Sequence, residues 1–246
     1  MTMSSKAGVW AGIAVLVLAL GAGGWLLFRA PRVPAFPINP KDRIASWTFK
    51  GTYTGYPSFI TKANTDLANL RMDMRQGKYD PYDLYIGMGE DYVLLGNGKA
   101  AYNAFNHAIA LYPNQGLAYT DLAALMSELG ARYTAADAYQ RAEVAQPSVL
   151  TYHLEQLNFL TNYFATDTPR VAAAFADSSK QFGDIAQVLQ IEAQWLAGLG
   201  QYAKAIQAYQ RAIAISPGRD VSGMERAIAQ LKAKEARQAA ASSTKA

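Results

Sequence analysis

The residues best suited to chemistry in this chain are its two histidines. His107 and His153 are the side chains with an ordinary pKa near neutrality. Neither has a serine, aspartate and glycine arrangement typical of a nucleophile elbow, and they do not form a metal-binding pair. The chain has no cysteine, which excludes disulfides, zinc–cysteine sites and thiol catalysis. We therefore predict no catalytic, cofactor-binding or metal-binding residue and no enzyme; a partner contact is the expected role of both histidines.

Two other stretches invite a chemical interpretation that their spacing does not support. Residues 96–99, GNGK, lack the spacing of a phosphate-binding loop and no strand precedes them, so an inter-helix turn explains them. Asp80, Asp83, Glu90 and Asp91 lack the spacing of a calcium loop. We interpret these carboxylates as a solvated or partner-facing edge.

The composition is that of a folded chain. Of its 246 residues 51% are hydrophobic, enough for a core and one membrane segment. The net charge is +4 with a pI near 9.1, and the Lys and Arg residues are scattered along the sequence. A nucleic-acid-binding surface would concentrate them. We predict neither a nucleic-acid partner nor a small-molecule substrate.

Small and aromatic residues recur at a fixed spacing in the second half of the chain. Ala205, Tyr209 and Ala212 share one helical face after Gly200, and Pro217 ends that helix. The same template recurs upstream at Gly130, Ala135, Tyr139, Ala142 and Pro147, and again at Gly96, Ala101, Phe105, Ala108 and Pro113. Between these copies, Phe175 occupies the aromatic position of a degenerate pair.

This period near 34 resembles the tetratricopeptide repeat family. Tyr85, Met88, Gly89 and Tyr92 fit its W-x2-L-G-x2-Y pattern, whereas Leu189 and Glu192 depart from it in the last repeat. The resemblance covers about residues 82–217. It implies an all-α, right-handed superhelical solenoid of about four helix pairs, one of them degenerate. The flanking sequence adds capping helices at both ends and one N-terminal transmembrane helix.

The domain organisation that we expect follows the composition along the chain. Four prolines forbid a continuous helix near residue 35, and Trp47 lies in an aromatic stretch that could meet a membrane, bind a partner or cover the open end of the first repeat. The predicted parts are a stub (1–6), a transmembrane helix (7–28), a Pro-rich and aromatic linker (29–56), a capping helix and loop (57–81), repeats (82–115, 116–149, degenerate 150–185 and 186–217), a capping helix (218–236) and a flexible tail (237–246).

In this family the first helices of successive repeats line a concave groove. The resemblance therefore implies a partner-binding groove made of Asp83, Ile86, Glu90, Val93, Leu117, Thr120, Ala124, Ser127, His153, Gln156, Leu160, Tyr163, Gln187, Gln190 and Gln194. These positions carry almost no basic charge, so the clamp that holds a C-terminal carboxylate in some family members is absent. Amide, aliphatic and aromatic groups suit a helical or extended protein segment.

Residues 7–28 contain no charged side chain, and 22 residues at about 1.5 Å each span roughly 33 Å, enough to cross a bilayer core of about 30 Å. We predict a single-pass membrane helix; a cleaved signal peptide is the alternative. Gly8 and Gly12 form a G-x-x-x-G pair that would let another membrane helix approach. Basic residues after the helix favour a cytoplasmic C-terminal domain, whereas signal-like anchors usually export the domain attached to them. We favour the extracytoplasmic side of an inner membrane.

Two functions agree with these features. The first is a non-enzymatic membrane scaffold whose repeats dock a permanent protein neighbour, making the chain an accessory or assembly subunit of a multiprotein membrane complex. The alternative is a transient adaptor or chaperone-like protein that binds secretory or assembly clients in the same groove. One tight stoichiometric partner would indicate the scaffold, and many exchangeable ones would indicate the adaptor.

Overall fold

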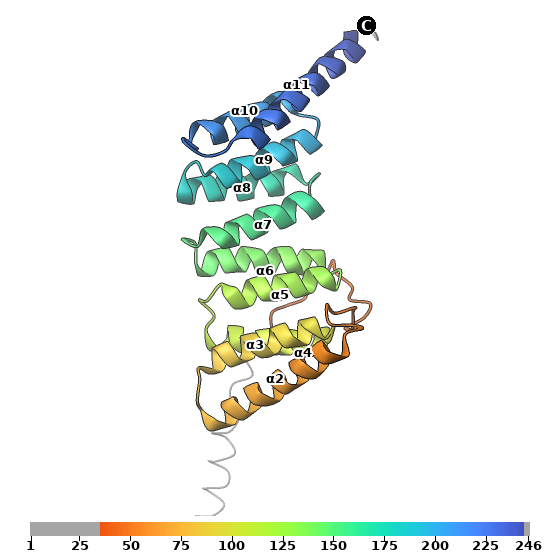
Figure 1. Cartoon of the computed structure of the whole chain (residues 1–246), viewed down its shortest axis with the longest axis vertical. Helices are drawn as coiled ribbons and strands as arrows, with labels where there is room; N and C mark the ends of the chain where they lie inside the picture. The colour runs from red at the N-terminus through yellow and green to blue at the C-terminus, as the bar shows by residue number, and fades with distance from the viewer. Residues whose placement is uncertain (1–34, 244–246) are drawn as a thin grey trace, which may run out of the picture. The chain divides into compact units, whose positions relative to one another are not determined.

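Glycines and prolines divide the repeat region into helices of similar length. The computed structural model describes residues 35–243, and within this range it contains ten α-helices and no β-strand. They are α2 (Pro57–Gln76), α3 (Pro81–Leu94), α4 (Gly98–Leu111), α5 (Leu117–Glu128), α6 (Arg132–Ala145), α7 (Leu150–Tyr163), α8 (Thr168–Phe182), α9 (Ala186–Gly198), α10 (Tyr202–Ala214) and α11 (Ser222–Ser243). Figure 1 shows α3 to α10 as antiparallel pairs stacked in order. The predicted all-helical repeat fold is confirmed.

Each regular pair is held by a face of small residues around one ring. On α4, Ala101 and Ala108 are fully buried on either side of Phe105. A Cβ added to Gly89 of α3 would lie only 2.2 Å from the Phe105 ring, so glycine is needed where the two helices touch. Gly96, with φ +74, makes the left-handed turn between them. The predicted template thus has a direct packing role.

The irregular pair, α7 and α8, keeps this packing with a different turn. Phe175 occupies the aromatic position of α8 and is 6% exposed. No left-handed glycine joins the two helices; instead the Asp167 side chain accepts a hydrogen bond from the Arg170 amide and caps α8. The Trp195 indole of α9 donates to the Ala165 carbonyl over 2.8 Å. A polar cap and a neighbouring repeat therefore hold a turn that glycine makes elsewhere.

Helix α2 covers the open end of the first pair. Pro57 lies in its first turn and Gly77, with φ +62, ends it. Leu67 is 2% exposed and packs in one cluster with Met88 and Ala104 of the first pair. This apolar contact makes α2 the N-terminal cap of the stack.

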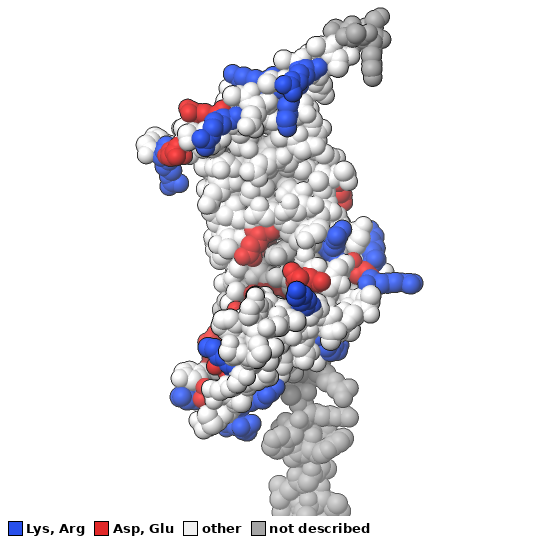
Figure 2. Space-filling model, turned by 45° about the vertical axis from the view of Figure 1, so that its right-hand side comes forward, with Lys and Arg blue, Asp and Glu red and all other residues white. Residues whose placement is uncertain are grey.

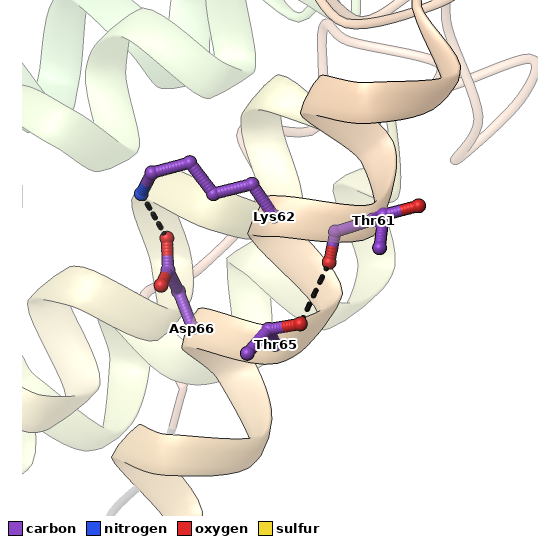
Figure 3. A network of polar contacts seen from close by, with 4 residues as sticks. All are labelled: Thr61, Lys62, Thr65 and Asp66. Carbon is purple, nitrogen blue, oxygen red and sulfur yellow. Dashed lines mark hydrogen bonds and ion pairs between the residues drawn. The ribbon is translucent and has the colours of Figure 1, made fainter.

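The opposite face of α2 is polar and solvated. Lys62 pairs with Asp66 one turn later over 2.5 Å, and the Thr65 hydroxyl donates to the Thr61 carbonyl over 3.0 Å (Figure 3). An exposed pair of this spacing contributes little to stability, because water and salt screen it. The helix is therefore held mainly by its apolar face.

Residues 36–56, which we call the strap, lie across the second helices of the first two pairs. The Tyr102 hydroxyl of α4 donates to the Phe36 carbonyl over 2.6 Å, and the Trp47 ring lies 5.1 Å from the Tyr102 ring. The Phe49 amide donates to the Gly96 carbonyl over 3.2 Å. Of the three roles considered for this stretch, covering the open end of the first repeat belongs to α2 instead (Figure 1).

The strap also caps α6, whose own N-terminal residue provides no capping side chain. The Asp42 carboxylate accepts hydrogen bonds from the Tyr133 amide (3.2 Å) and the Thr134 amide (2.6 Å). The Thr134 hydroxyl donates to Asp42 over 2.7 Å and accepts from the Asn39 amide over 2.9 Å. A residue about 90 positions upstream thus satisfies two of the free amides at this helix start.

Helix α11 closes the other end of the stack. Leu231 is 5% exposed and packs with Ile206 and Tyr209 of the last pair. The flexible tail predicted for residues 237–246 is corrected in part, because α11 continues to Ser243. The continuation needs no apolar partner, since alanine-rich sequence favours a helix by itself.

Within residues 35–243, no helix has the length and apolar composition needed to cross a bilayer. The predicted membrane helix at 7–28, with Gly8 and Gly12, lies outside the described residues.

Candidate partner-binding groove

The first helix of each pair, α3, α5, α7 and α9, carries the predicted groove residues, and their exposure divides them. Seven are exposed: Asp83, Glu90, Leu117, Ala124, Tyr163, Gln187 and Gln194. Three are half-buried: Val93, Ser127 and Gln190. Five are buried: Ile86, Thr120, His153, Gln156 and Leu160. The exposed and half-buried residues remain candidate contacts, and the buried five need correction.

Ile86 and Thr120 take the same position on α3 and α5, where the neighbouring helix covers them. Ile86 belongs to the main apolar core. The Thr120 hydroxyl donates to the Leu117 carbonyl of its own helix over 2.9 Å. Neither side chain is available to a partner, because the helix faces are more closely packed here than the family template implies.

The α7 residues were assigned with a register error of two positions. The Tyr119 hydroxyl donates to the Pro113 carbonyl over 3.1 Å, and His153 Nε2 lies 3.1 Å from the Pro147 carbonyl oxygen. This repeated contact shows that α7 follows α5 at the regular period. The slip of two residues falls in the turn after Tyr163. His153, Gln156 and Leu160 therefore fill core positions, which is why they are buried.

The corrected register places polar residues of α7 beside α5. A cavity of about 330 Å³ opens there, lined by Ala124, Ser127, Glu128, Tyr139, Glu155, Asn158, Phe159, Asn162 and Tyr163. Three of these, Ala124, Ser127 and Tyr163, were predicted. Glu155, Asn158 and Asn162 were missed; comparing His153 with Tyr119 at the period of 34 would have identified Asn158, whereas Glu155 and Asn162 lie outside the four positions carried over from the family. The structure thus brings the middle of the predicted groove together.

The first helices carry carboxylates and no basic residue. Neither α3, α5, α7 nor α9 contains a Lys or an Arg, although the whole chain has a net charge of +4. Burial, with Glu90 and Glu155 nearby, raises the pKa of Asp121 to about 7. Burial also raises the pKa of Glu155. Figure 2 shows a largely uncharged middle with red side chains at its centre, and most blue ones towards the ends and one edge.

A second polar cluster lies inside the stack between α6 and α7. Glu143 Oε1 is 3.4 Å from His153 Nδ1, and the Gln156 amide nitrogen, turned towards the carboxylate, donates to Oε1 over 2.8 Å. Burial, and the nearby Asp177, raise the pKa of Glu143 to about 8, and burial lowers the pKa of His153. Both groups are therefore largely uncharged near neutrality. His153, expected to contact a partner, has a packing role instead.

The remaining candidates for chemistry are His107 and a metal-binding group. His107 is exposed and stacks on Tyr85 with ring centroids 4.8 Å apart. In the part of the chain that the structure describes, no group of three or more His, Asp or Glu side chains has a geometry suited to a metal ion.

Comparison with known families matches residues 186–219, the α9–α10 pair, to the description "Tetratricopeptide repeat". This chain carries a tetratricopeptide repeat (TPR). The matched residues include Gly200, Ala205, Tyr209 and Ala212, the template that the sequence repeats upstream. The recognition of the TPR family is confirmed; a membrane-anchored type is a separate prediction.

Several solved structures are similar to this chain. The structure titled "Crystal structure of MamA" is 14% identical, covers 66% of this chain and 91% of that one, and has a TM-score of 0.50. YrrB, titled "a TPR protein with an unusual peptide-binding site", is 19% identical, with coverages of 69% and 86% and a TM-score of 0.48. TTC0263, a TPR protein of Thermus thermophilus, is 14% identical, with coverages of 73% and 96% and a TM-score of 0.47.

Identities this low concern the fold alone. Among curated proteins no sequence match was found.

Proposed function

We propose that this chain is a non-enzymatic TPR scaffold. Residues 7–28 anchor it in a membrane, and the face made by α3, α5, α7 and α9 holds a permanent protein neighbour. The chain is then an accessory or assembly subunit of a multiprotein membrane complex. TPR repeats mediate protein–protein contacts, and the proposal applies that general role to this chain.

The observation that carries the proposal is the hollowed face between α5 and α7. Its cavity of about 330 Å³ combines two tyrosine rings, Tyr139 and Tyr163, with the amides of Asn158 and Asn162. Aromatic and amide groups are suited to a peptide segment, because rings bind side chains while amides pair with its backbone. The cavity is too open and too small for a whole domain, so a single segment of the partner is the occupant that fits it.

The non-enzymatic part rests on the role of each histidine. His153 lies in the core beside Glu143, and His107 stacks on Tyr85 at the surface. A packing role accounts for both.

The membrane part rests on the sequence of residues 7–28, which carry no charge and are bracketed by Lys6 and Arg29. We place the repeats on the extracytoplasmic side of an inner membrane. Protease added to intact spheroplasts should then digest the repeats while leaving a cytoplasmic control protein intact. Digestion only after lysis would place them in the cytoplasm.

The scaffold is tested by purifying the full-length protein in mild detergent and measuring its companions by mass spectrometry. We expect one stoichiometric partner that remains bound during size-exclusion chromatography. A chain that always elutes alone contradicts the scaffold. Many substoichiometric, exchangeable companions would instead indicate the transient adaptor.

The docking face is tested by changing Gln190 and Gln194 together to glutamate. Both lie on α9, one exposed and one half-buried, so helix content and melting temperature should hardly change. Partner binding should fall, because the new carboxylates would lose water on docking. The matched control changes the exposed Gln207 and Gln210 of α10 to glutamate. Equal effects of the two pairs would contradict docking on the first helices.

A further inference from the structure

The acidic side chains of the first helices line up from one repeat to the next. Asp121 and Glu155 occupy equivalent positions of α5 and α7, since they are one period of 34 apart, and Glu90 of α3 is close enough to act on Asp121. Like charges facing one another destabilise the folded chain unless something compensates them. A stable chain keeps such an arrangement where function requires it.

One buried polar atom in this row has no hydrogen-bond partner within the described residues. It is Oδ2 of the half-buried Asp121. A buried polar atom without a partner destabilises the folded chain, so this oxygen calls for a hydrogen-bonding group that enters from outside.

The adjoining cavity has the side chains that receive a cation. Glu128 and Glu155 supply negative charge, and the rings of Tyr139, Phe159 and Tyr163 supply aromatic faces. One face of Tyr163 already carries the Arg132 guanidinium, 4.7 Å from the ring centroid. Arg132 belongs to α6 and lies at the edge of the cavity, so it does not neutralise Asp121.

From this charge row, the unpaired Asp121 oxygen and the aromatic cavity, we infer that the groove across α3, α5 and α7 binds a protein segment bearing at least two Lys or Arg residues. The inference rests on the proposed scaffold function and specifies the chemistry of its partner. Packed helices lie about 10 Å apart, so the two cations should be spaced by a similar distance. That corresponds to about three residues in an extended segment, or about seven on a helix.

The charge pattern argues for a peptide and not for a nucleic acid or an anionic membrane. Phosphates would be repelled by Glu90, Asp121 and Glu155, and no Lys or Arg of the four first helices could offset that repulsion. Complementary charge also steers association and makes it sensitive to salt.

The test uses the full-length protein and a random dodecapeptide library displayed on phage. Selected peptides should carry two or more Lys or Arg residues. Their affinity, measured by fluorescence anisotropy, should fall steeply when salt rises from about 0.1 M to about 1 M, where the screening length shrinks from about 10 Å to about 3 Å.

The variant with Asp121→Asn and Glu155→Gln should bind these peptides about tenfold more weakly or worse. It should melt at the same or a higher temperature at pH 8, because it loses two half-buried like charges. A structural defect would lower the peptide affinity and the melting temperature together. The matched control, Asp177→Asn with Glu225→Gln, removes the same charge from exposed positions of α8 and α11 and should change affinity less than about twofold.

A third variant, Ala124→Trp, separates this inference from the proposed function. Ala124 is exposed and lines the cavity, so the indole should fill it. If the peptides no longer bind Ala124→Trp but bind the variant with Asp121→Asn and Glu155→Gln normally, the cationic partner is contradicted and docking in the groove is supported. Peptides that ignore Ala124→Trp, or a library that yields none, would contradict the groove function itself.

Discussion

The pairs α5–α6 and α7–α8 solve the same packing problem with different side chains. Tyr119 of α5 and His153 of α7 both hydrogen-bond the proline carbonyl that precedes their helix, over 3.1 Å in each case. One turn later, Leu122 is fully buried on α5, whereas Gln156 is buried at the equivalent position of α7. The backbone arrangement is kept while the side chains change from apolar to polar.

The difference shows that the repeat geometry tolerates a polar interior in which Gln156 pairs with Glu143 while His153 Nδ1 has no hydrogen-bond partner. His153 and Gln156 both face Glu143, which replaces the apolar residue found at Ile109 one period upstream. The groups of such a cluster pack correctly only with one another, but the cluster contributes less to the free energy of unfolding than apolar packing does. The irregular pair should therefore be the weaker part of the stack.

The largest expected effect comes from removing the ring that each pair is built around. Tyr209→Ala in the regular α9–α10 pair should lower the free energy of unfolding by about 3 kcal/mol, because the ring is 7% exposed and its loss leaves a cavity. Hydrogen exchange should increase first in α10 and α11, since repeats interact mainly with their neighbours.

Phe175→Ala in the irregular pair is the matching variant. It should have a similar effect on stability but increase exchange on both sides of α8. Increased exchange confined to α3 and α4 in either variant would contradict the repeat register.

Converting the polar cluster to the residues of the regular repeats should have the next largest effect. Glu143→Ile, His153→Tyr and Gln156→Leu together should raise the free energy of unfolding in urea by about 2 kcal/mol. Gln156→Leu alone should lower it by about 1–3 kcal/mol, because Glu143 then loses its amide donor. If the triple variant were less stable than the parent chain, the cluster would be a stabilising element.

The same cluster predicts how stability depends on pH. The pKa of Glu143 is raised from 4.5 to about 8, so folding holds a proton that the unfolded chain has released, and stability falls as pH rises through this range. The lowered pKa of His153 acts in the opposite direction, but only below its ordinary value of 6.5.

Between pH 6.5 and 8 the parent chain should therefore lose about 1–2 kcal/mol relative to the triple variant. Asp121 titrates in the same range but is common to both proteins. Parallel stability curves for the two proteins would mean that Glu143 titrates normally.

The smallest expected effect concerns the strap. Asp42→Ala removes the acceptor for the Tyr133 and Thr134 amides, and should cost about 1 kcal/mol in thermal unfolding. Asp42→Asn keeps a carbonyl oxygen and should cost less. Equal losses would indicate that the negative charge, and not the cap, stabilises α6.

How far the sequence predicts this molecule depends on whether a contact repeats. The alternation of Ala101, Phe105 and Ala108 recurs, so the helix pairs could be predicted from it. The strap could not, because Asp42 and Thr134 are 92 residues apart and meet once. The predicted α7 groove residues were two positions out of register, because His153 and Gln156 stand where the regular repeats have tyrosine and leucine. Asp121 and Glu155 were missed because only four positions per helix were carried over from the family.

The strap also has a consequence for the order in which the chain unfolds. A stack of repeats with only local contacts can lose its helices one pair at a time from either end. Hydrogen bonds from Phe36, Asn39 and Asp42 reach α4 and α6 across 66 to 95 residues, so neither of the first two pairs can leave alone. The later pairs are not linked to the strap and can separate one at a time. We therefore expect the array to unfold in order from α11 to α7, and then to lose α3 to α6 in one cooperative step.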